Sequence, residues 1–397
     1  MATQQPPPEA KLVDKFTDGI SELQYLRSST SSSLSSNNDS KKLLASTSWD
    51  GAVRVHDTAG DNSPLLLTHN MESGPLLSLA VPARSSSSEA TTIIAGGLDG
   101  SVKSFDIATS AVQSIGSHGR NSSSVSSSSN NGNSSSNACS CLSAMSNDSS
   151  SSNVVISASW NRQLCIWDLR QQQRNGSNAI PAAEAVLPGK AFAMDVDATR
   201  NRVLVATSGR RNCFFDLRML KDEENEKEKS KIFKFDSVLE RESSLKFQTR
   251  CVKFFPDGHG FCLGSIEGRV GVEFLDELVD VQMKLTRYAF KCHRSANGLV
   301  HPVNAIDFHP KHRHTFATGG CDGTVVLWDG QNKKKLTVLP AFPTSISALC
   351  FSPDGTELAI ASSYTHEEGD REQHPQDELY VRPILDSEAT PKIIQQP

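Results

Sequence analysis

Short apolar stretches alternate with polar turns along almost the whole chain. Alternation of this kind is typical of β-strands, and six times two such stretches are joined by a turn with a small or acidic residue and end on Asp. The six endings are SWDGAVRVHD (48–57), GLDGSVKSFD (97–106), SWNRQLCIWD (159–168), SGRRNCFFD (208–216), SIEGRVGVEFLD (265–276) and GCDGTVVLWD (320–329). A seventh, weaker copy covers 344–384. Because no single unit can bury its apolar faces alone, the pattern predicts a closed ring of packed sheets.

Repeats with these Asp endings and four strands each are typical of WD-repeat β-propellers. We therefore predict an all-β, seven-bladed propeller. The domain is expected at 11–385, with a flexible tail at 1–10 and a second tail at 386–397. Length alone would favour two or three domains, but the repeats predict one large disc.

The sixth repeat gives the clearest blade. Its strands a to d are predicted at 303–310, 315–320, 324–329 and 335–340. The tight b–c turn falls at Asp322-Gly323, where glycine supplies a positive φ. In such blades a Trp, a Ser or Thr, an Asp and a His often form a hydrogen-bonded tetrad. The predicted members are Trp328, Thr318, Asp322 and His301. A structural role for this histidine is favoured over a role as ligand or base.

The seventh repeat lacks its outer strand. It offers strands at 345–352, 357–364 and 378–384 and then ends. The N-terminal KLVDKF (11–16) has no repeat of its own, so we expect it to pair beside 379–384. This pairing would remove an exposed sheet edge, which is otherwise an aggregation hazard.

Low-complexity inserts interrupt the repeats. They cover 28–40, 84–90, 121–136, 146–153 and the charged 221–231. Such compositions cannot pack a core. Four of them fall in a–b or c–d loops, and only 121–136 falls on the face formed by b–c and d–a loops, which we call the top face. We interpret the top face as kept clear for a partner; chance insertion into tolerant loops is the alternative.

Composition narrows the possible functions. The net charge of −5 and the pI near 6.1 give no strong attraction to nucleic acid. No apolar run approaches 18 residues and the start has no apolar signal core, so we expect a soluble, intracellular protein with no membrane partner. Nine cysteines stand mostly singly within strand patterns, which indicates reduced thiols.

Catalytic and metal motifs are missing from the sequence. There is no GxxxxGK[ST], GxSxG, HExxH or paired CxxC, so we predict no enzyme activity, no cofactor and no metal. Cys139 and Cys141 favour core thiols over a metal site. The His- and acid-rich stretch 366–377 favours a solvated loop over a cation site.

Binding residues are expected on the top face. Trp49 and Trp160 stand at b–c turns, where a contact role is plausible. Basic residues fall in the b–c turns and the d–a segment of blades four and five: Arg210, Arg211, Lys246, Arg250 and Arg269. Adjacent Arg and Lys can hold carboxylates or a phosphorylated side chain. The alternative is a scattered set of solvated charges.

Whole segments carry a family resemblance. They are RESSLKFQTR (241–250), GSIEGRVGVEFLD (264–276), YAFKCHR (288–294), HPVNAIDFHP (301–310), ATGGCDGTVVLWD (317–329) and PTSISALCFSPDGTELAIASSY (343–364). Over nearly all of the chain except the inserts and the proline-rich start, the sequence resembles the spindle-checkpoint WD-repeat proteins of the Bub family. It is also similar, in GSIEGRV and FKCHR, to the mRNA-export WD-repeat proteins of the nuclear pore. PTSISAL and TELAIASSY fit the checkpoint proteins better.

The checkpoint resemblance implies a non-enzymatic adaptor that carries Bub kinases to kinetochores. It implies that a GLEBS segment, an extended acidic stretch of the kinases, contacts Trp49, Trp160, Arg210 and Arg211. It further implies that Lys246 and Arg269 hold the phosphothreonine of a Met-Glu-Leu-Thr motif in the kinetochore scaffold.

The resemblance also implies location and further partners. The protein is expected in the nucleus, at kinetochores in mitosis and in the cytoplasm, with anaphase-promoting-complex inhibitors of the mitotic checkpoint complex as further partners. The insert at 121–136 departs from the family and would lie near blade three. The export resemblance instead implies a factor that binds a GLEBS segment and single-stranded RNA, for which a basic stripe with stacking aromatics is needed.

Overall fold

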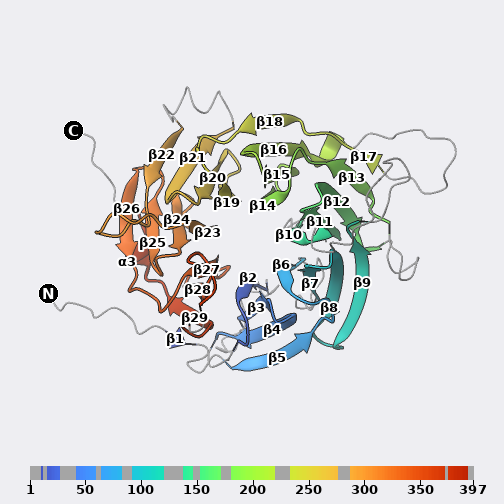
Figure 1. Ribbon diagram of the computed structural model, residues 1–397, viewed down its shortest axis with the longest axis horizontal. Helices are drawn as coiled ribbons and strands as arrows, with labels where there is room; N and C mark the ends of the chain where they lie inside the picture. Colours follow the sequence, from blue (N-terminus) through green and yellow to red (C-terminus); the bar gives the residue numbers. More distant parts are fainter. Residues whose placement is uncertain are drawn as a thin grey trace, which may run out of the picture.

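Seven sheets, antiparallel except for one added strand in blade 3, stand like blades around a central channel (Figure 1). The computed structural model describes residues 10–11, 16–26, 42–59, 64–82, 92–119, 137–145, 153–170, 180–219, 233–275, 287–371 and 374–391. The predicted all-β, seven-bladed propeller is confirmed. The expected inserts 28–40, 84–90, 121–136 and 221–231 lie outside the described residues, as does 146–153 except for Asn153.

The strands follow the chain in order around the ring. Blade 1 contains β2 (Ile20–Tyr25), β3 (Leu43–Ser48), β4 (Ala52–Asp57) and β5 (Leu65–Asn70), and blade 2 contains β6 (Leu76–Ala80), β7 (Thr92–Gly97), β8 (Ser101–Asp106) and β9 (Ala111–Ser117). Blade 3 contains β10 (Cys139–Ala144), β11 (Val154–Ser159), β12 (Gln163–Asp168), β13 (Ala183–Val186) and β17 (Phe233–Lys234). Blade 4 contains β14 (Ala191–Asp197), β15 (Arg202–Thr207), β16 (Arg211–Asp216) and β18 (Leu239–Glu242).

The second half of the ring repeats this order. Blade 5 contains β19 (Thr249–Phe254), β20 (Gly260–Ser265), β21 (Arg269–Phe274) and β22 (Tyr288–Lys291), and blade 6 contains β23 (Val303–Phe308), β24 (Thr315–Gly320), β25 (Val325–Asp329) and β26 (Lys334–Val338). Blade 7 contains β27 (Ile346–Phe351), β28 (Glu357–Ser362), β29 (Glu378–Pro383) and β1 (Ala10–Lys11). Among the described residues, the short helix η2 (Leu217–Met219) follows β16, and α3 (Asp386–Ala389) follows β29.

Packing between blades explains why the strands alternate. Ile156 and Leu164 of blade 3 share one apolar cluster with Val203 and Phe215 of blade 4. The second strand of a blade is covered on both faces, and every residue of β24 is buried. Each large apolar side chain removed from water in this way contributes about 1.5–3 kcal/mol. The ring is therefore stabilised by contacts between neighbouring blades.

The tetrad of blade 6 corrects one predicted residue. Thr318 Oγ1 accepts a hydrogen bond from Trp328 Nε1 at 2.9 Å and lies 2.9 Å from Nε2 of His293, whose Nδ1 is 2.9 Å from Asp322 Oδ1. His293, and not His301, completes the network, because the histidine that reaches the core comes directly after the outer strand β22. The predicted His301 instead contacts Ser295, with 2.7 Å between Nε2 and Oγ.

The N-terminal segment closes the ring. Ala10 and Lys11 pair with Val381 and Tyr380, so β1 is the outer strand of blade 7, as predicted. The pairing covers two residues, and 12–15 lie outside the described residues. Just after this gap, Phe16 is 4% exposed and its ring lies 4.5 Å from the Arg54 guanidinium of blade 1. The start of the chain thus attaches to both blades at the closure.

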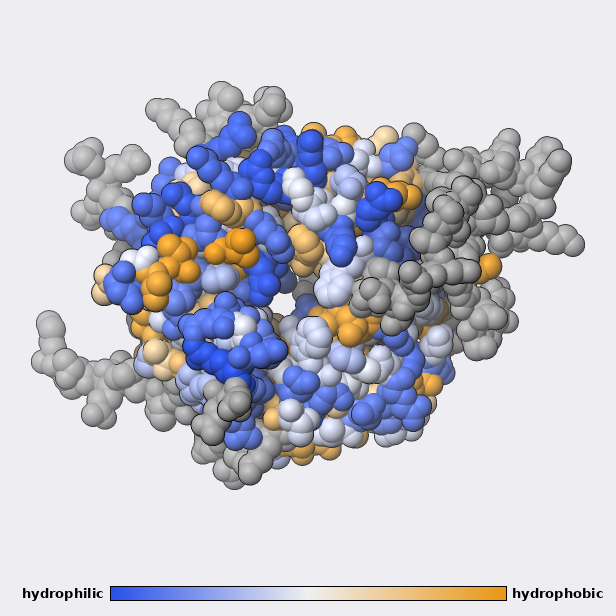
Figure 2. Space-filling model, in the orientation of Figure 1, coloured by the Kyte–Doolittle hydropathy of each residue, from blue (hydrophilic) through white to orange (hydrophobic). Residues whose placement is uncertain are grey.

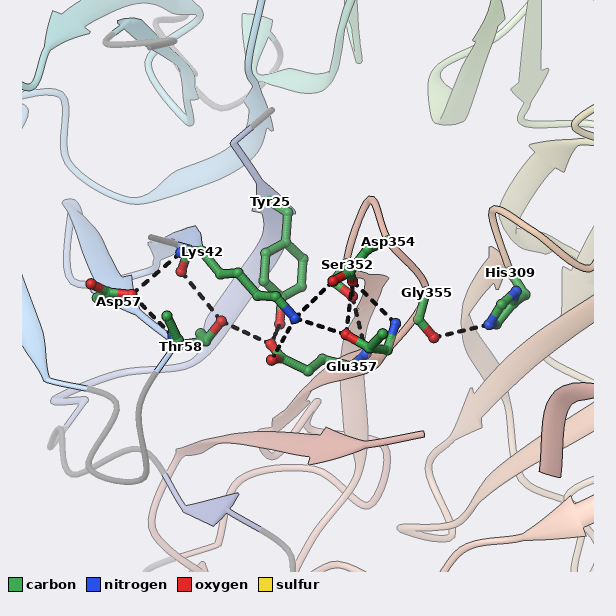
Figure 3. Close-up of polar contacts among 11 residues, drawn as sticks. Tyr25, Lys42, Asp57, Thr58, His309, Ser352, Asp354, Gly355 and Glu357 are labelled. Atoms are coloured by element: carbon green, nitrogen blue, oxygen red, sulfur yellow. Dashed lines mark hydrogen bonds and ion pairs between the residues drawn. The ribbon is translucent and has the colours of Figure 1, made fainter. Parts of the chain in front are cut away.

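A polar network on the face opposite the top face also joins blades 1 and 7 (Figure 3). Lys42 Nζ lies 2.9 Å from Asp354 Oδ2 and 2.9 Å from Glu357 Oε1. The other oxygen of Glu357 accepts hydrogen bonds from Thr58 and Tyr25 at 2.8 and 3.2 Å. Partial burial opposes ionisation of Asp354, but hydrogen bonds from Ser352 and Lys42 hold its pKa well below the ordinary value. Ring closure therefore uses charged contacts as well as a shared strand.

Blade 3 gains a fifth strand that the repeats did not predict. Phe233 and Lys234 run parallel to Ala183 and Glu184 of β13. Phe235 is 5% exposed and its ring meets Phe215 edge-on, with 5.4 Å between centroids. The loop of blade 4 that contains the charged insert is therefore anchored on the outer edge of blade 3.

Carboxylates in the channel hold neighbouring blades together. Backbone N–H groups of Leu79, Phe254 and Phe351 each donate at 2.7 Å to a carboxylate of the preceding blade, from Glu22, Asp195 and Asp307 respectively. Lys253 Nζ lies 3.6 Å from both aspartates. All four ionisable side chains line the channel. These four side chains thus hold neighbouring blades together in the described part of the ring.

We expect Glu22→Gln to stabilise the protein at alkaline pH. Enclosure in the channel raises the pKa of Glu22 from 4.5 to about 7. The folded chain therefore holds a proton that the unfolded chain releases between these values, so stability falls as pH rises through this window. Gln keeps an acceptor for the Leu79 N–H without the charge. The melting temperature should exceed that of the wild type by about 2–4 °C at pH 8, and the gap should shrink towards pH 4.5. A gap that does not change with pH would contradict this account.

Candidate functional site

The top face brings three of the predicted basic residues together. Arg210 lies in the β15–β16 turn, Lys246 in the loop between β18 and β19, and Arg269 at the start of β21. Arg210 Nη1 donates to the Leu245 carbonyl at 3.2 Å, beside Lys246. The Lys246 backbone N–H donates to Glu267 Oε1 at 3.3 Å, and Arg269 Nε lies 3.4 Å from Glu267 Oε2. Two loops of blade 5 and one turn of blade 4 therefore form one cationic site.

Donors at this site are available to a ligand. Within the described part of the chain, Lys246 Nζ has no ion-pair partner, and the nearest approach of Arg269 to Glu267 is through Nε. The Arg269 side chain is 33% exposed. Lys291 stands opposite Arg269 in the sheet, and Arg294 Nη2 donates to the Glu267 carbonyl at 3.0 Å. Four basic residues therefore lie on the segments next to Glu267, and only Arg269 pairs with its carboxylate there; such a group of basic side chains can bind an anion.

The remaining predicted arginines make exposed contacts. Arg210 pairs with Glu242, and Arg211 Nε lies 3.7 Å from Glu240 Oε1. Exposed pairs of this kind contribute about 0–1 kcal/mol, so an incoming acidic segment can replace them. Arg250 is bonded to Asn304 Oδ1 of blade 6 through Nε and Nη2, at 3.3 and 3.1 Å.

The two turn tryptophans lie over other blades. Trp49 is 41% exposed in the turn of blade 1, and Trp160 is half-buried in the turn of blade 3. Both line the mouth of the central channel, whose volume is about 920 Å³. The structure therefore sets these rings at the channel and the Lys246–Arg269 site over blades 4 and 5, so only an extended ligand reaches both.

Apolar residues beside the cations were missed in the sequence. Phe247, Ile266 and Val300 are 52%, 38% and 41% exposed. Ile266 N–H donates to the Gln248 carbonyl at 3.1 Å, and a Cβ placed on Gly268 would meet the Val300 side chain at 3.0 Å. Figure 2 shows hydrophobic residues on this part of the molecule, over blades 5 and 6. Phe247 and Ile266 stand next to Lys246 and Glu267 in the chain, but only the fold reveals that they are exposed together.

The predicted core thiols lie inside blade 3. Cys139 and Cys141 are buried in β10, and burial raises the pKa of Cys141 to about 12. Among the described residues, no three His, Cys, Asp or Glu side chains are close enough to hold a metal ion. In the 366–377 stretch, His374 stacks on Tyr364 with 5.5 Å between ring centroids. None of the helices described here has the length and apolar character needed to cross a membrane.

Fold and site together define a WD-repeat propeller with a cationic, partly apolar face for partners. Residues 287–329 match the family described as WD domain, G-beta repeat. The chain is 35% identical over 372 residues to the mitotic checkpoint protein bub3 of Dictyostelium discoideum, covering 93% of this chain and 92% of that protein. It is 34% identical over 359 residues to the mitotic checkpoint protein bub-3 of Caenorhabditis elegans, with 88% and 89% covered. The chain belongs to the bub3 family of mitotic checkpoint proteins.

An export protein is also similar. The mRNA export factor GLE2 of Chaetomium thermophilum is 30% identical over 362 residues, which cover 89% of this chain and 87% of that protein. The lower identity agrees with the preference for the checkpoint family that the sequence segments indicate.

Proposed function

We propose that this protein is a non-enzymatic mitotic checkpoint adaptor whose top face binds two partners. One is the acidic GLEBS segment of Bub-family kinases. The other is a phosphorylated Met-Glu-Leu-Thr motif of the kinetochore scaffold. In this role the protein acts at kinetochores in mitosis, resides in the nucleus and cytoplasm, and joins anaphase-promoting-complex inhibitors in the mitotic checkpoint complex. Membership of the checkpoint family supports the proposal.

The observation that carries it is the pair of available cationic donors at Lys246 and Arg269, which Glu267 links. A phosphothreonine has a charge of about −1.5 to −2 and three acceptor oxygens. The planar end of Arg269 can donate two parallel hydrogen bonds to it, and Lys246 can add a point charge. Exposed Phe247 and Ile266 offer apolar surface for the Met and Leu side chains of the same motif.

The kinase segment would span the rest of the face. An acidic peptide that pairs with Arg210 and Arg211 would displace the exposed Glu242 and Glu240. From there an extended chain can cross the channel mouth to Trp160 and Trp49. Stacking and burial of these two rings would then add to the charge contacts.

Reversing both arginines tests the kinase site. We expect the double variant Arg210→Glu, Arg211→Glu to bind an acidic GLEBS peptide at least about tenfold more weakly than the wild type does, because two attractive contacts become repulsive. Isothermal titration calorimetry measures the affinity, and circular dichroism checks the fold. The matched control is Arg170→Glu with Arg218→Glu, which reverses two exposed, paired arginines in loops of the opposite face. Equal peptide affinity in the test and control variants would place the kinase site elsewhere.

One pull-down distinguishes the adaptor from the export alternative. Exposed Trp49 and Phe247 belong to blades 1 and 5, which does not fit consecutive bases stacking along a basic stripe. We expect the tagged protein to recover Bub-family kinases and the kinetochore scaffold from mitotic extract, read by mass spectrometry. Recovery of nuclear-pore proteins with bound RNA would favour the export function instead.

A further inference from the structure

Glu267 stands inside the cationic site, where a phosphate-binding surface would be expected to exclude negative charge. It occupies the β20–β21 turn, and its side chain is only 16% exposed. One carboxylate oxygen accepts the Lys246 N–H at 3.3 Å, and the other lies 3.4 Å from Arg269 Nε. A single side chain therefore links the two segments that provide the proposed phosphate contacts.

The contact to Arg269 lies on the inner side of its guanidinium. The nitrogen nearest to Glu267 is Nε, whereas a bidentate pair with a phosphate would use the two terminal nitrogens. At the same time the carboxylate cancels one positive charge next to the ligand. Glu267 thus orients Arg269 and lowers its attraction for an anion.

We infer that Glu267 is a built-in counter-charge that keeps the phosphothreonine interaction weak enough to reverse. This inference rests on the proposed phosphate-reading function. Glu267 and a phosphate with a charge of about −2 are both anions within one site, so the ligand and Glu267 repel each other. Glu267 therefore determines how tightly the phosphorylated motif is held, and the phosphate-free motif is unaffected.

Glu267→Gln separates charge from shape. Gln has the same length and retains an acceptor oxygen, so the turn keeps its geometry. We expect this variant to bind the phosphorylated Met-Glu-Leu-Thr peptide about fivefold or more tightly than the wild type, and the unphosphorylated peptide equally. The gain should shrink at high salt. It should also be larger at pH 7.5 than at pH 5.5, because the second phosphate ionisation has a pKa of about 6. The charged groups on the segments around the site are Lys246, Lys291, Arg269, Arg294 and Glu267 itself.

Two further variants make the result decisive. Glu368→Gln removes the same charge from the β28–β29 loop of the same face, but its side chain is 58% exposed and pairs with Arg371, so we expect less than about a twofold change in affinity for the phosphorylated peptide. Glu267→Ala removes the negative charge and also the contact that orients Arg269. Its gain in affinity for the phosphorylated peptide should therefore be smaller than the gain for Glu267→Gln. An equal gain for Ala would overturn the orienting role.

The outcomes also separate this inference from the proposed function. Suppose that the wild type prefers the phosphorylated peptide and that Glu267→Gln binds this peptide no more tightly than the wild type does. The proposed role of Glu267 as a counter-charge is then wrong, and the phosphate-reading function stands. If the wild type binds both peptides equally, phosphate reading fails and the counter-charge fails with it.

Discussion

Alanine at Lys246 or Arg269 is expected to lower the affinity for a phosphorylated Met-Glu-Leu-Thr peptide by about tenfold or more. Hydrogen bonds to charged groups contribute about 1.5–3 kcal/mol each, which corresponds to this loss. Binding of the unphosphorylated peptide should not change. Calorimetry with the matched peptides measures both affinities.

Lysine at position 269 provides the geometric test. Arg269→Lys keeps the positive charge but loses the planar donor pair. Its affinity for the phosphorylated peptide should therefore lie between those of Arg269→Ala and the wild type. The matched control is Lys190→Ala, which removes an exposed lysine from a loop of the same face before blade 4. Unchanged affinity in both alanine variants, or the same loss in the Lys190 control, would show that the phosphate lies elsewhere.

Removing residues 1–17 is expected to lower the free energy of unfolding by about 3 kcal/mol or more. The deletion takes away β1 and the buried Phe16 ring, and removal of a buried Phe side chain alone costs about 3–5 kcal/mol. It also frees the edge of β29. The melting temperature should fall by about 5 °C or more, and aggregation should increase. Differential scanning calorimetry follows the first effect and light scattering the second.

Shorter changes separate the contributions. Deletion of 1–9 retains β1 and should melt like the full chain. Deletion of 1–12 removes only the paired strand, and Phe16→Ala removes only the packed ring. If deletion of 1–17 melts like deletion of 1–9, the N-terminal segment does not hold the ring closed.

The local pattern was enough to predict the blades. Strand alternation and turn residues act over neighbouring positions, so the strand predicted at 315–320 matches β24 residue for residue. The turn at Asp322-Gly323 follows from the same logic, since Gly323 has a φ of +70°. Strand order alone then sets Arg210, Lys246 and Arg269 on one face, because every b–c turn and d–a loop opens to the same side.

Contacts between residues far apart in the chain could not be predicted from the local sequence pattern. The tetrad histidine was predicted at His301, and only packing of the loop after β22 selects His293, eight positions earlier in the chain. The fifth strand of blade 3 depends on a loop from the next blade and carries no repeat signal.

The amino-acid sequence by itself determined the seven-bladed ring, the closing role of the N-terminal segment and the face that carries the basic residues. These features depend on periodicity and on the order of strands. Only the tertiary structure set Glu267 between Lys246 and Arg269 and exposed Phe247 beside them. Lys246 and Glu267 are 21 positions apart and belong to different loops, so their contact exists only after β19 and β20 have paired and blade 5 has packed into the ring.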